Sequence, residues 1–185
     1  AQGATVTLKL FVITLLLAVP LGLVLALARV SRWKALSAFV NGYIWLMRGT
    51  PLMLQMLFIY FALPFVPVIG VRLPDFPAAV VAFALNYAAY FAEIFRAGIQ
   101  SIDRGQMEAG RSLGMTWGQT MRYIVVPQAF KRVIPQLGNE FIALLKDSSL
   151  VSVIGFEELT RRGHLIIAKT YASVEIWTCV AVIYL

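Results

Sequence analysis

Glu108-Ala109-Gly110-Arg111-Ser112-Leu113-Gly114 is a polar stretch that lies between two strongly apolar regions of the chain. A chain that is otherwise suited to lipid has no solvation reason to collect charges and glycines in one place. We therefore expect this stretch to lie in water and to contact a partner protein. Residues 106–113 predict a short helix, and Gly114 offers the left-handed backbone at which a helix can end.

The composition indicates that lipid is the main solvent of the chain. Hydrophobic residues make up 60% of the 185 residues and charged residues 14%, with a mean hydropathy of +0.80. In a soluble domain about a quarter of the residues are charged. The net charge of +7 does not indicate nucleic-acid binding, because the basic residues cluster at the ends of apolar runs instead of along one polar face.

The residue types that build disulfides, metal sites and catalytic sites are sparse. Cys179 is the one cysteine and His164 the one histidine, so an internal disulfide and a metal site of His and Cys ligands both have too few members. The isolated Ser, His and Asp residues show no catalytic arrangement, and no Gly-x-x-x-x-Gly-Lys-Ser/Thr loop for ATP is present. We expect no catalytic residue and no metal on this chain.

Five transmembrane helices are predicted from the apolar runs. The run 10–28 contains no charged residue, and at about 1.5 Å per residue it is long enough to cross a hydrocarbon core of about 30 Å. Basic residues follow this run instead of preceding it, so we expect a retained helix and not a cleaved signal peptide. The predicted spans are about 6–28, 48–68, 76–102, 132–154 and 165–185.

The predicted topology is least regular around the second, fourth and fifth spans. Pro51 is favourable in the first turn of the second span, where Thr50 can act as the cap, and residues 36–47 before it predict an interfacial or partly inserted helix. The fifth span ends abruptly at Leu185, so we expect the chain to stop inside a membrane helix, with a truncated C-terminus. The fourth span is interrupted by Asn139, Glu140, Lys146 and Asp147.

Basic residues near the span ends predict the orientation, because cytoplasmic loops carry an excess of lysine and arginine. One side has only Lys9, Arg72, Arg161 and Arg162. We expect the other side to be cytoplasmic and to hold the loop 103–131, with the N-terminus outside and the missing C-terminus inside. That side carries Arg29, Arg32, Lys34, Arg104, Arg111, Arg122, Lys131 and Arg132.

Several motifs in this order resemble one family. Glu108-Ala109-Gly110, followed by Gly114, Ile124 and Pro127, is similar to the EAA loop of ABC-transporter permease subunits, the membrane partners of binding-protein-dependent importers. Other segments are similar to the polar amino-acid branch of those permeases, and the resemblance covers nearly the whole chain. These segments are Arg48-Gly49-Thr50-Pro51-Leu52, Asn86-Tyr87-Ala88-Ala89-Tyr90, Ala92-Glu93-Ile94-Phe95-Arg96, Gly105-Gln106, Arg122-Tyr123, Pro127-Gln128-Ala129 and Leu145-Lys146-Asp147-Ser148-Ser149-Leu150.

The resemblance implies an all-α integral membrane protein of the MetI-like permease fold, with five transmembrane helices and a cytoplasmic coupling helix. It implies that this helix docks in a cleft of a cytosolic ATP-binding subunit, which holds the ATP and Mg. It also implies a second permease subunit, identical or paralogous, an extracytoplasmic substrate-binding protein, an amino-acid substrate and a location in the bacterial inner membrane. The coupling residues are then Gln106, Glu108, Ala109, Gly110, Arg111, Ser112, Leu113 and Gly114.

The chain departs from the family at two positions of this loop. The family usually has alanine at Gly110 and leucine at Val126. Glycine within a helix costs about 1 kcal/mol relative to alanine. We therefore expect a slightly looser coupling helix, with the charges and the turn at Gly114 retained.

Polar residues inside the predicted spans are candidates for a solute path, because charges in lipid normally face the protein interior or a wet cavity. Asn86, Tyr90 and Glu93 share one helix face, as do Glu140 and Asp147. A zwitterionic amino acid needs a cationic or N–H partner for its carboxylate and an anionic partner for its ammonium. The predicted path residues are Asn86, Glu140, Asp147 and Ser148.

Structural explanations remain open for most of these residues. Glu93 can pair with Arg96, and Glu108 with Arg111, each at a helical spacing of three. Asn86 can bond to a neighbouring helix, and Lys146 and Asp147 can belong to a polar network at a helix interruption. An ion-coupled secondary transporter, with a proton carried by Glu93, Glu140 or Asp147, is the alternative function.

Overall fold

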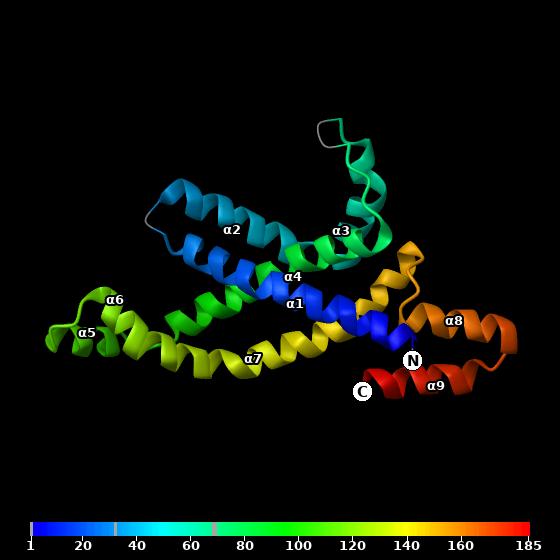
Figure 1. The fold of residues 1–185 in the computed structure, drawn as a ribbon. Helices are drawn as coiled ribbons and strands as arrows, with labels where there is room; N and C mark the ends of the chain where they lie inside the picture. The colour runs from blue at the N-terminus through cyan, green and yellow to red at the C-terminus, as the bar shows by residue number, and fades with distance from the viewer. Residues whose placement is uncertain (1, 32, 68–69) are drawn as a thin grey trace.

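The computed structural model describes residues 2–31, 33–67 and 70–185, and these residues form helices and connecting turns without a β-strand. Figure 1 shows an elongated bundle in which α5 and α6 lie at one end and α8 and α9 at the other. The elements are α1 (Gln2–Arg29), α2 (Lys34–Gly49), α3 (Leu52–Leu57), η1 (Phe58–Ala62), η2 (Leu63–Phe65), α4 (Asp75–Gln100), α5 (Arg104–Ser112), α6 (Trp117–Thr120), η3 (Met121–Val125), α7 (Val126–Asp147), η4 (Ser148–Ile154), α8 (Leu159–Thr170) and α9 (Ser173–Tyr184).

The centre of the fold is the packing of α1 against α4. The buried residues of α1 recur every three or four positions and most are small, which lets two helix backbones approach closely without a large side chain between them. Alanines supply much of the buried surface of α4. The buried stripe of α1 is Gly3, Thr7, Leu10, Thr14, Ala18, Gly22 and Ala26.

Gly22 marks the tightest point of this packing, and its replacement by alanine is expected to destabilise the protein. A Cβ at Gly22 would lie 2.6 Å from the Cβ of Phe91 and 3.0 Å from the carbonyl oxygen of Ala88. The Ala88 carbonyl belongs to the backbone of α4 and cannot move without distorting that helix. We therefore expect the free energy of unfolding to fall by about 1–3 kcal/mol, as for other overpacked cores. Thermal unfolding of the detergent-solubilised protein measures the loss.

Gly42→Ala is the matched control for this substitution. Gly42 also lies within a helix, but a Cβ there meets no atom within 4 Å. Its replacement should leave the melting temperature unchanged or raise it slightly, because alanine is the better helix former. Equal melting temperatures for the two variants would contradict the close approach of α1 and α4.

The second predicted span begins later than expected. Residues 48 and 49 end α2, and the chain bends by 104° before it continues through α3, η1 and η2 to Phe65. The reason is Pro51, which has no N–H to continue a helix and holds Thr50 extended. Thr50 does not cap the following helix, because its hydroxyl donates to the Leu46 carbonyl at 2.8 Å. The predicted helix over 36–47 is present as α2.

The fifth predicted span is also divided. The prediction of one helix over 165–185 is wrong, because α8 ends at Thr170 and α9 begins at Ser173. The break lies at Tyr171, whose positive φ of 59° ends α8. The first and third spans are continuous helices, as predicted, since α1 runs through Pro20 and α4 reaches Gln100.

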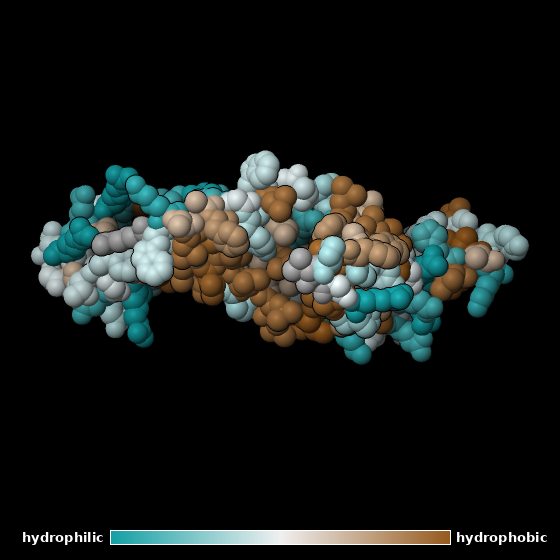
Figure 2. All heavy atoms as spheres, turned by 90° about the horizontal axis from the view of Figure 1, so that it is seen from above, coloured by the Kyte–Doolittle hydropathy of each residue, from teal (hydrophilic) through white to brown (hydrophobic). Residues whose placement is uncertain are grey.

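The surface is consistent with a protein that crosses a membrane. Figure 2 shows hydrophobic residues gathered around the middle of the long axis and hydrophilic residues at both ends. Among the described residues, α1 and α4 are each long and apolar enough to span a membrane, and the bent pair from α2 to η2 makes a third span if it crosses as one unit. The count of five spans stays a prediction.

Candidate functional site

The coupling segment, which we define as residues 104–114, is a short helix with defined ends. The carboxylate of Asp103 accepts from the backbone N–H of Gly105 at 2.6 Å and starts α5. The helix closes through two backbone bonds, from Gly114 to the Arg111 carbonyl and from Met115 to the Gly110 carbonyl. This is the Schellman arrangement, and Gly114 takes the left-handed backbone it requires, with φ of +77°. The predicted end at Gly114 is confirmed.

Most of the coupling segment faces solvent. Glu108 and Arg111 are exposed and, within the described part of the chain, they do not form an ion pair with each other. The local pairing that remained open from the sequence is therefore absent. Leu113 is 80% exposed and Trp117, at the start of α6, is 62% exposed. The segment thus offers charged and apolar side chains together, which suits contact with another protein.

Gly110 is the buried member of the predicted coupling set, and it lies at the contact between α5 and α6. A Cβ at this position would lie 2.6 Å from Cγ2 and 2.7 Å from Oγ1 of Thr120, which is itself fully buried. Glycine at position 110 therefore lets α6 pack closely on α5. The expectation of a looser coupling helix stays a prediction.

A second group of predicted residues meets in a cavity between α2, α3, α4 and α7. This cavity, which we call the far cavity, has a volume of about 760 Å³ and is lined by Asn86, Glu140 and Asp147. The Tyr87 hydroxyl donates to Asp147 at 2.8 Å. Ser148, the fourth predicted path residue, does not line this cavity. It is fully buried, and its hydroxyl donates to the Leu145 carbonyl at 2.6 Å.

Asn86 also has a structural role, because it bonds to α2 and α3. Its amide nitrogen donates to the Met47 carbonyl and to the Gln55 side chain, both at 3.0 Å. Gln55 in turn donates to Met47 and Thr50. These bonds satisfy carbonyls that the break between α2 and α3 leaves without helical partners. The open explanation that Asn86 bonds a neighbouring helix is therefore supported, although the residue borders the cavity.

Glu93 is held between two arginines. It pairs with Arg96 on its own helix, as the sequence allowed, and also with Arg29 at the end of α1. The second pair joins residues 64 positions apart and ties α1 to α4. A carboxylate between two guanidinium groups loses much of the cost of a charge in an apolar region.

Arg48 is the site residue that sequence reasoning missed. It lies at the end of α2, where the helix breaks, and its guanidinium stands over the Tyr90 ring at 5.3 Å. It lines the far cavity together with the carboxylates of Glu140 and Asp147. A signal was present in the sequence, because Arg48 follows an apolar helix and precedes Gly-Thr-Pro, a break inside an apolar region.

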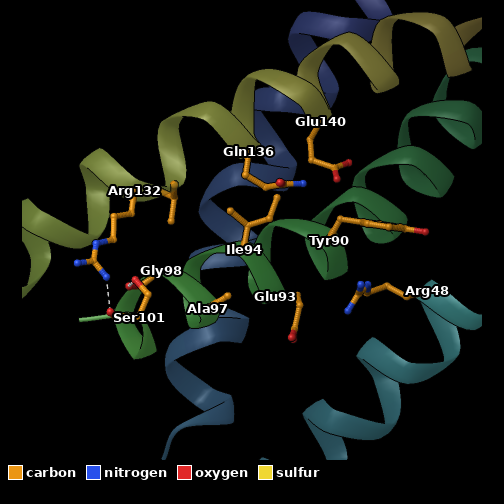
Figure 3. Close-up of a pocket in the computed structure, with 11 residues that line it drawn as sticks. Arg48, Tyr90, Glu93, Ile94, Ala97, Gly98, Ser101, Arg132, Gln136 and Glu140 are labelled. Carbon is orange, nitrogen blue, oxygen red and sulfur yellow. Dashed lines mark hydrogen bonds between the residues drawn. The ribbon is translucent and has the colours of Figure 1, made fainter. Parts of the chain in front are cut away.

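A smaller cavity lies closer to the coupling segment. This near cavity has a volume of about 430 Å³, and Figure 3 shows side chains from α2, α4 and α7 around it. Arg132 lies at one end, where it donates to the Ser101 carbonyl. No group of three or more metal-ligating side chains occurs among residues 2–31, 33–67 and 70–185.

Comparison with known proteins finds transport-system proteins by family model, by sequence and by structure. The family model described as "Binding-protein-dependent transport system inner membrane component" matches residues 18–185. An arginine transport system permease protein of Bacillus subtilis is 41% identical over 183 residues, which cover 99% of this chain and 83% of the relative. A glutamine transport system permease protein of Escherichia coli is 42% identical over 184 residues, which cover 100% of this chain and 84% of the relative. A crystal structure of an amino acid ABC transporter with histidines aligns with a TM-score of 0.91 and 47% identity, over 99% of this chain and 84% of that one.

Proposed function

Because the chain belongs to the family of binding-protein-dependent transport system inner membrane components, we propose that it is the membrane permease subunit of an ATP-driven ABC importer for polar amino acids. The observation that carries the proposal is the exposed coupling segment, with defined ends, at one end of an apolar helical bundle. The related arginine and glutamine permeases make L-arginine and L-glutamine the first candidate substrates.

The coupling segment transmits the motion of a cytosolic ATPase to the bundle. In this proposal α5 docks in the ATPase through residues 106 and 108–114, and α6 and η3 connect it to α7. The close packing of Gly110 on Thr120 makes α5 and α6 move together. ATP and Mg belong to the partner subunit, while a second permease subunit, related by a two-fold axis, completes the wall of the solute path in the bacterial inner membrane.

The solute path follows the polar faces of α4 and α7. Asn86, Glu140 and Asp147 border it in the far cavity, where an extracytoplasmic binding protein delivers the amino acid. Alternating access moves the substrate from there toward the coupling segment. An ion-coupled transporter is not favoured, because the relatives belong to ABC systems and because Glu93, one of its proton carriers, is paired with Arg29 and Arg96.

Uptake of labelled L-arginine and L-glutamine into proteoliposomes tests this function. The vesicles hold the permease with its ATPase and binding protein, and we expect accumulation that requires ATP. Accumulation that persists without the ATPase and follows a proton gradient would overturn the proposal.

Asp147→Ala is expected to lower this uptake at least about tenfold, because a charged partner in the path is lost. Binding of the ATPase to the permease should be unchanged, since Asp147 is the last residue of α7, whereas the coupling segment connects to the first residues of that helix through α6 and η3. Asn139→Ala is the matched control, as Asn139 is exposed on the same helix and lines neither cavity. Loss of ATPase binding in Asp147→Ala would assign the residue to assembly instead.

A further inference from the structure

The coupling segment is joined to α7 along the chain by a route that can bend. After Gly114 the chain passes through the four residues of α6 and then through η3, which is a π-helix over Met121–Val125. Pro127 gives a physical reason for the wider turn, because it has no N–H for the Tyr123 carbonyl and its ring would clash with that carbonyl in a regular α-helix. Sharp bends in helices occur at prolines and at π-turns. The route along the chain is therefore poorly suited to pass a displacement of α5 to α7.

Two side chains on α7 make a shorter connection. The Gln128 amide nitrogen donates to the side-chain oxygen of Gln106, in the first turn of α5, at 3.1 Å. Arg132, one turn further along α7, donates to the Ser101 carbonyl at the end of α4, as Figure 3 draws. Residues four positions apart share one helix face, so this face of α7 contacts both α4 and α5. The two bonds join residues 22 and 31 positions apart and bypass α6 and η3.

Apolar packing beside these bonds holds the same elements together. A Cβ at Gly98 would lie 2.2 Å from Cγ1 of Val133, so glycine lets α7 pack directly on the backbone of α4. A buried cluster continues this contact from the end of α4 to α5, η3 and α7. Its members are Ile99, Ile102, Met107, Met121, Val125 and Ala129. The packing brings the three helices together, and the two directional hydrogen bonds fix how α5 and the end of α4 are oriented on α7.

We propose that Gln128 and Arg132 are positioning residues that pass the motion of the coupling segment directly to α4 and α7. This inference rests on the proposed transport function and adds to it the residues that connect the ATPase to the helices of the solute path. When the ATPase displaces α5, the Gln128 bond moves α7 with it and the Arg132 bond moves the end of α4. Arg132 makes the stronger link, because a charged donor meets a helix end whose last carbonyls lack helical partners.

The number of ATP molecules hydrolysed per amino acid taken up measures this link. Gln128→Leu keeps the side chain at a similar size and removes the bond, so uptake should fall about threefold to tenfold, the range expected for one hydrogen bond. ATP hydrolysis by the complex should not change, because α5 still docks in the ATPase. Gln128→Glu should restore uptake, since its carboxylate accepts from the Gln106 amide. Arg132→Leu should raise the ratio of ATP to amino acid further, and Arg132→Lys should raise it less, because lysine keeps the charge and a donor.

Gln119→Leu is the matched control for Gln128→Leu. It also removes a bond of a glutamine side chain, which the Thr116 N–H donates at 2.8 Å, and this bond stabilises α6 on the route along the chain. Its ratio of ATP to amino acid should match that of the unaltered complex. A ratio that rises equally in the two variants, or in neither, would overturn the proposal. Absence of ATP-driven uptake in the unaltered complex would instead contradict the proposed function.

The joint movement of α5 and α7 has a test that needs no transport. In a Cys179→Ser background, spin labels are attached at Arg104→Cys on α5 and at Lys131→Cys on α7, both of which are exposed positions. Pulsed electron paramagnetic resonance of the permease–ATPase complex should give the same distance between the labels with and without bound ATP. With Gln128→Leu and Arg132→Leu added, ATP should shift or broaden that distance. A shift in the chain that keeps both residues would overturn the proposal, as would an unchanged distance after both are replaced.

Discussion

Replacing Gly114 by valine is expected to reduce ATP-driven uptake about tenfold or more, with the permease still folded in the membrane. Gly114 has a φ of +77°, and a Cβ there would meet no atom within 4 Å. The obstacle is therefore the backbone conformation alone, which costs an ordinary L-residue about 1–2 kcal/mol and a β-branched residue more. The chain can relieve this strain by opening the two bonds that end α5, which displaces Leu113, a large apolar side chain of the coupling segment that is 80% exposed.

The control for this prediction is Gly118→Val. Gly118 is also exposed and a Cβ there meets nothing within 4 Å, but its φ is not positive. Uptake should be close to normal in Gly118→Val and intermediate in Gly114→Asn, because asparagine tolerates the left-handed region better than valine. The ATPase subunit is the same in all of these vesicles, so its ATP hydrolysis measured without permease is the common reference. Normal uptake by Gly114→Val would mean that the end of α5 has no part in coupling.

The elements that could be predicted from the sequence are those decided by local composition. An uncharged run fixes α1, a second apolar run fixes α4, and Gly114 fixes the end of α5, since each depends only on neighbours along the chain. The sequence predicts a helix start at Pro51, but proline suits both the first turn of a helix and the end of the one before it. Both occur here, since α2 ends at Gly49 and α3 begins at Leu52, and the bonds from Gln55 and Asn86 across the bend depend on packing.

The residues of the candidate site also fall into those that the sequence identifies and those that depend on packing. Glu140, Asp147 and Asn86 could be identified because polar side chains in an apolar run stand out. The cation that faces them could not, because Arg48 lies at a helix end where arginines are common and its cavity exists only after α2 has packed on α4. The second partner of Glu93, Arg29, was likewise hidden, since a helical spacing indicates contacts only within one helix.

Replacing Glu158 by alanine is expected to destabilise the end of the bundle that α8 and α9 form, away from the coupling segment. Glu158 is fully buried and accepts three hydrogen bonds. Two come from the backbone N–H groups of Thr160 and Arg161, both at 2.7 Å, and begin α8. The third comes from the Tyr184 hydroxyl at 2.9 Å and joins the end of α9 to the start of α8. One carboxylate therefore closes the pair of helices that packs beside the N-terminal part of α1.

The expected loss follows from the three part-buried donors that alanine leaves without an acceptor. Loss of a helix cap costs about 1 kcal/mol, and each buried donor without an acceptor costs about 1–3 kcal/mol, so Glu158→Ala should lose about 3 kcal/mol of stability. For a chain of this length that corresponds to a melting temperature about 6–12 °C lower. Glu157→Ala is the matched control, because the Glu157 carboxylate next to it is exposed and, within the described part of the chain, pairs with Arg162 at the surface. That variant should melt within about 1–2 °C of the unaltered protein. Equal losses in the two variants would contradict the role of Glu158 in joining α8 to α9.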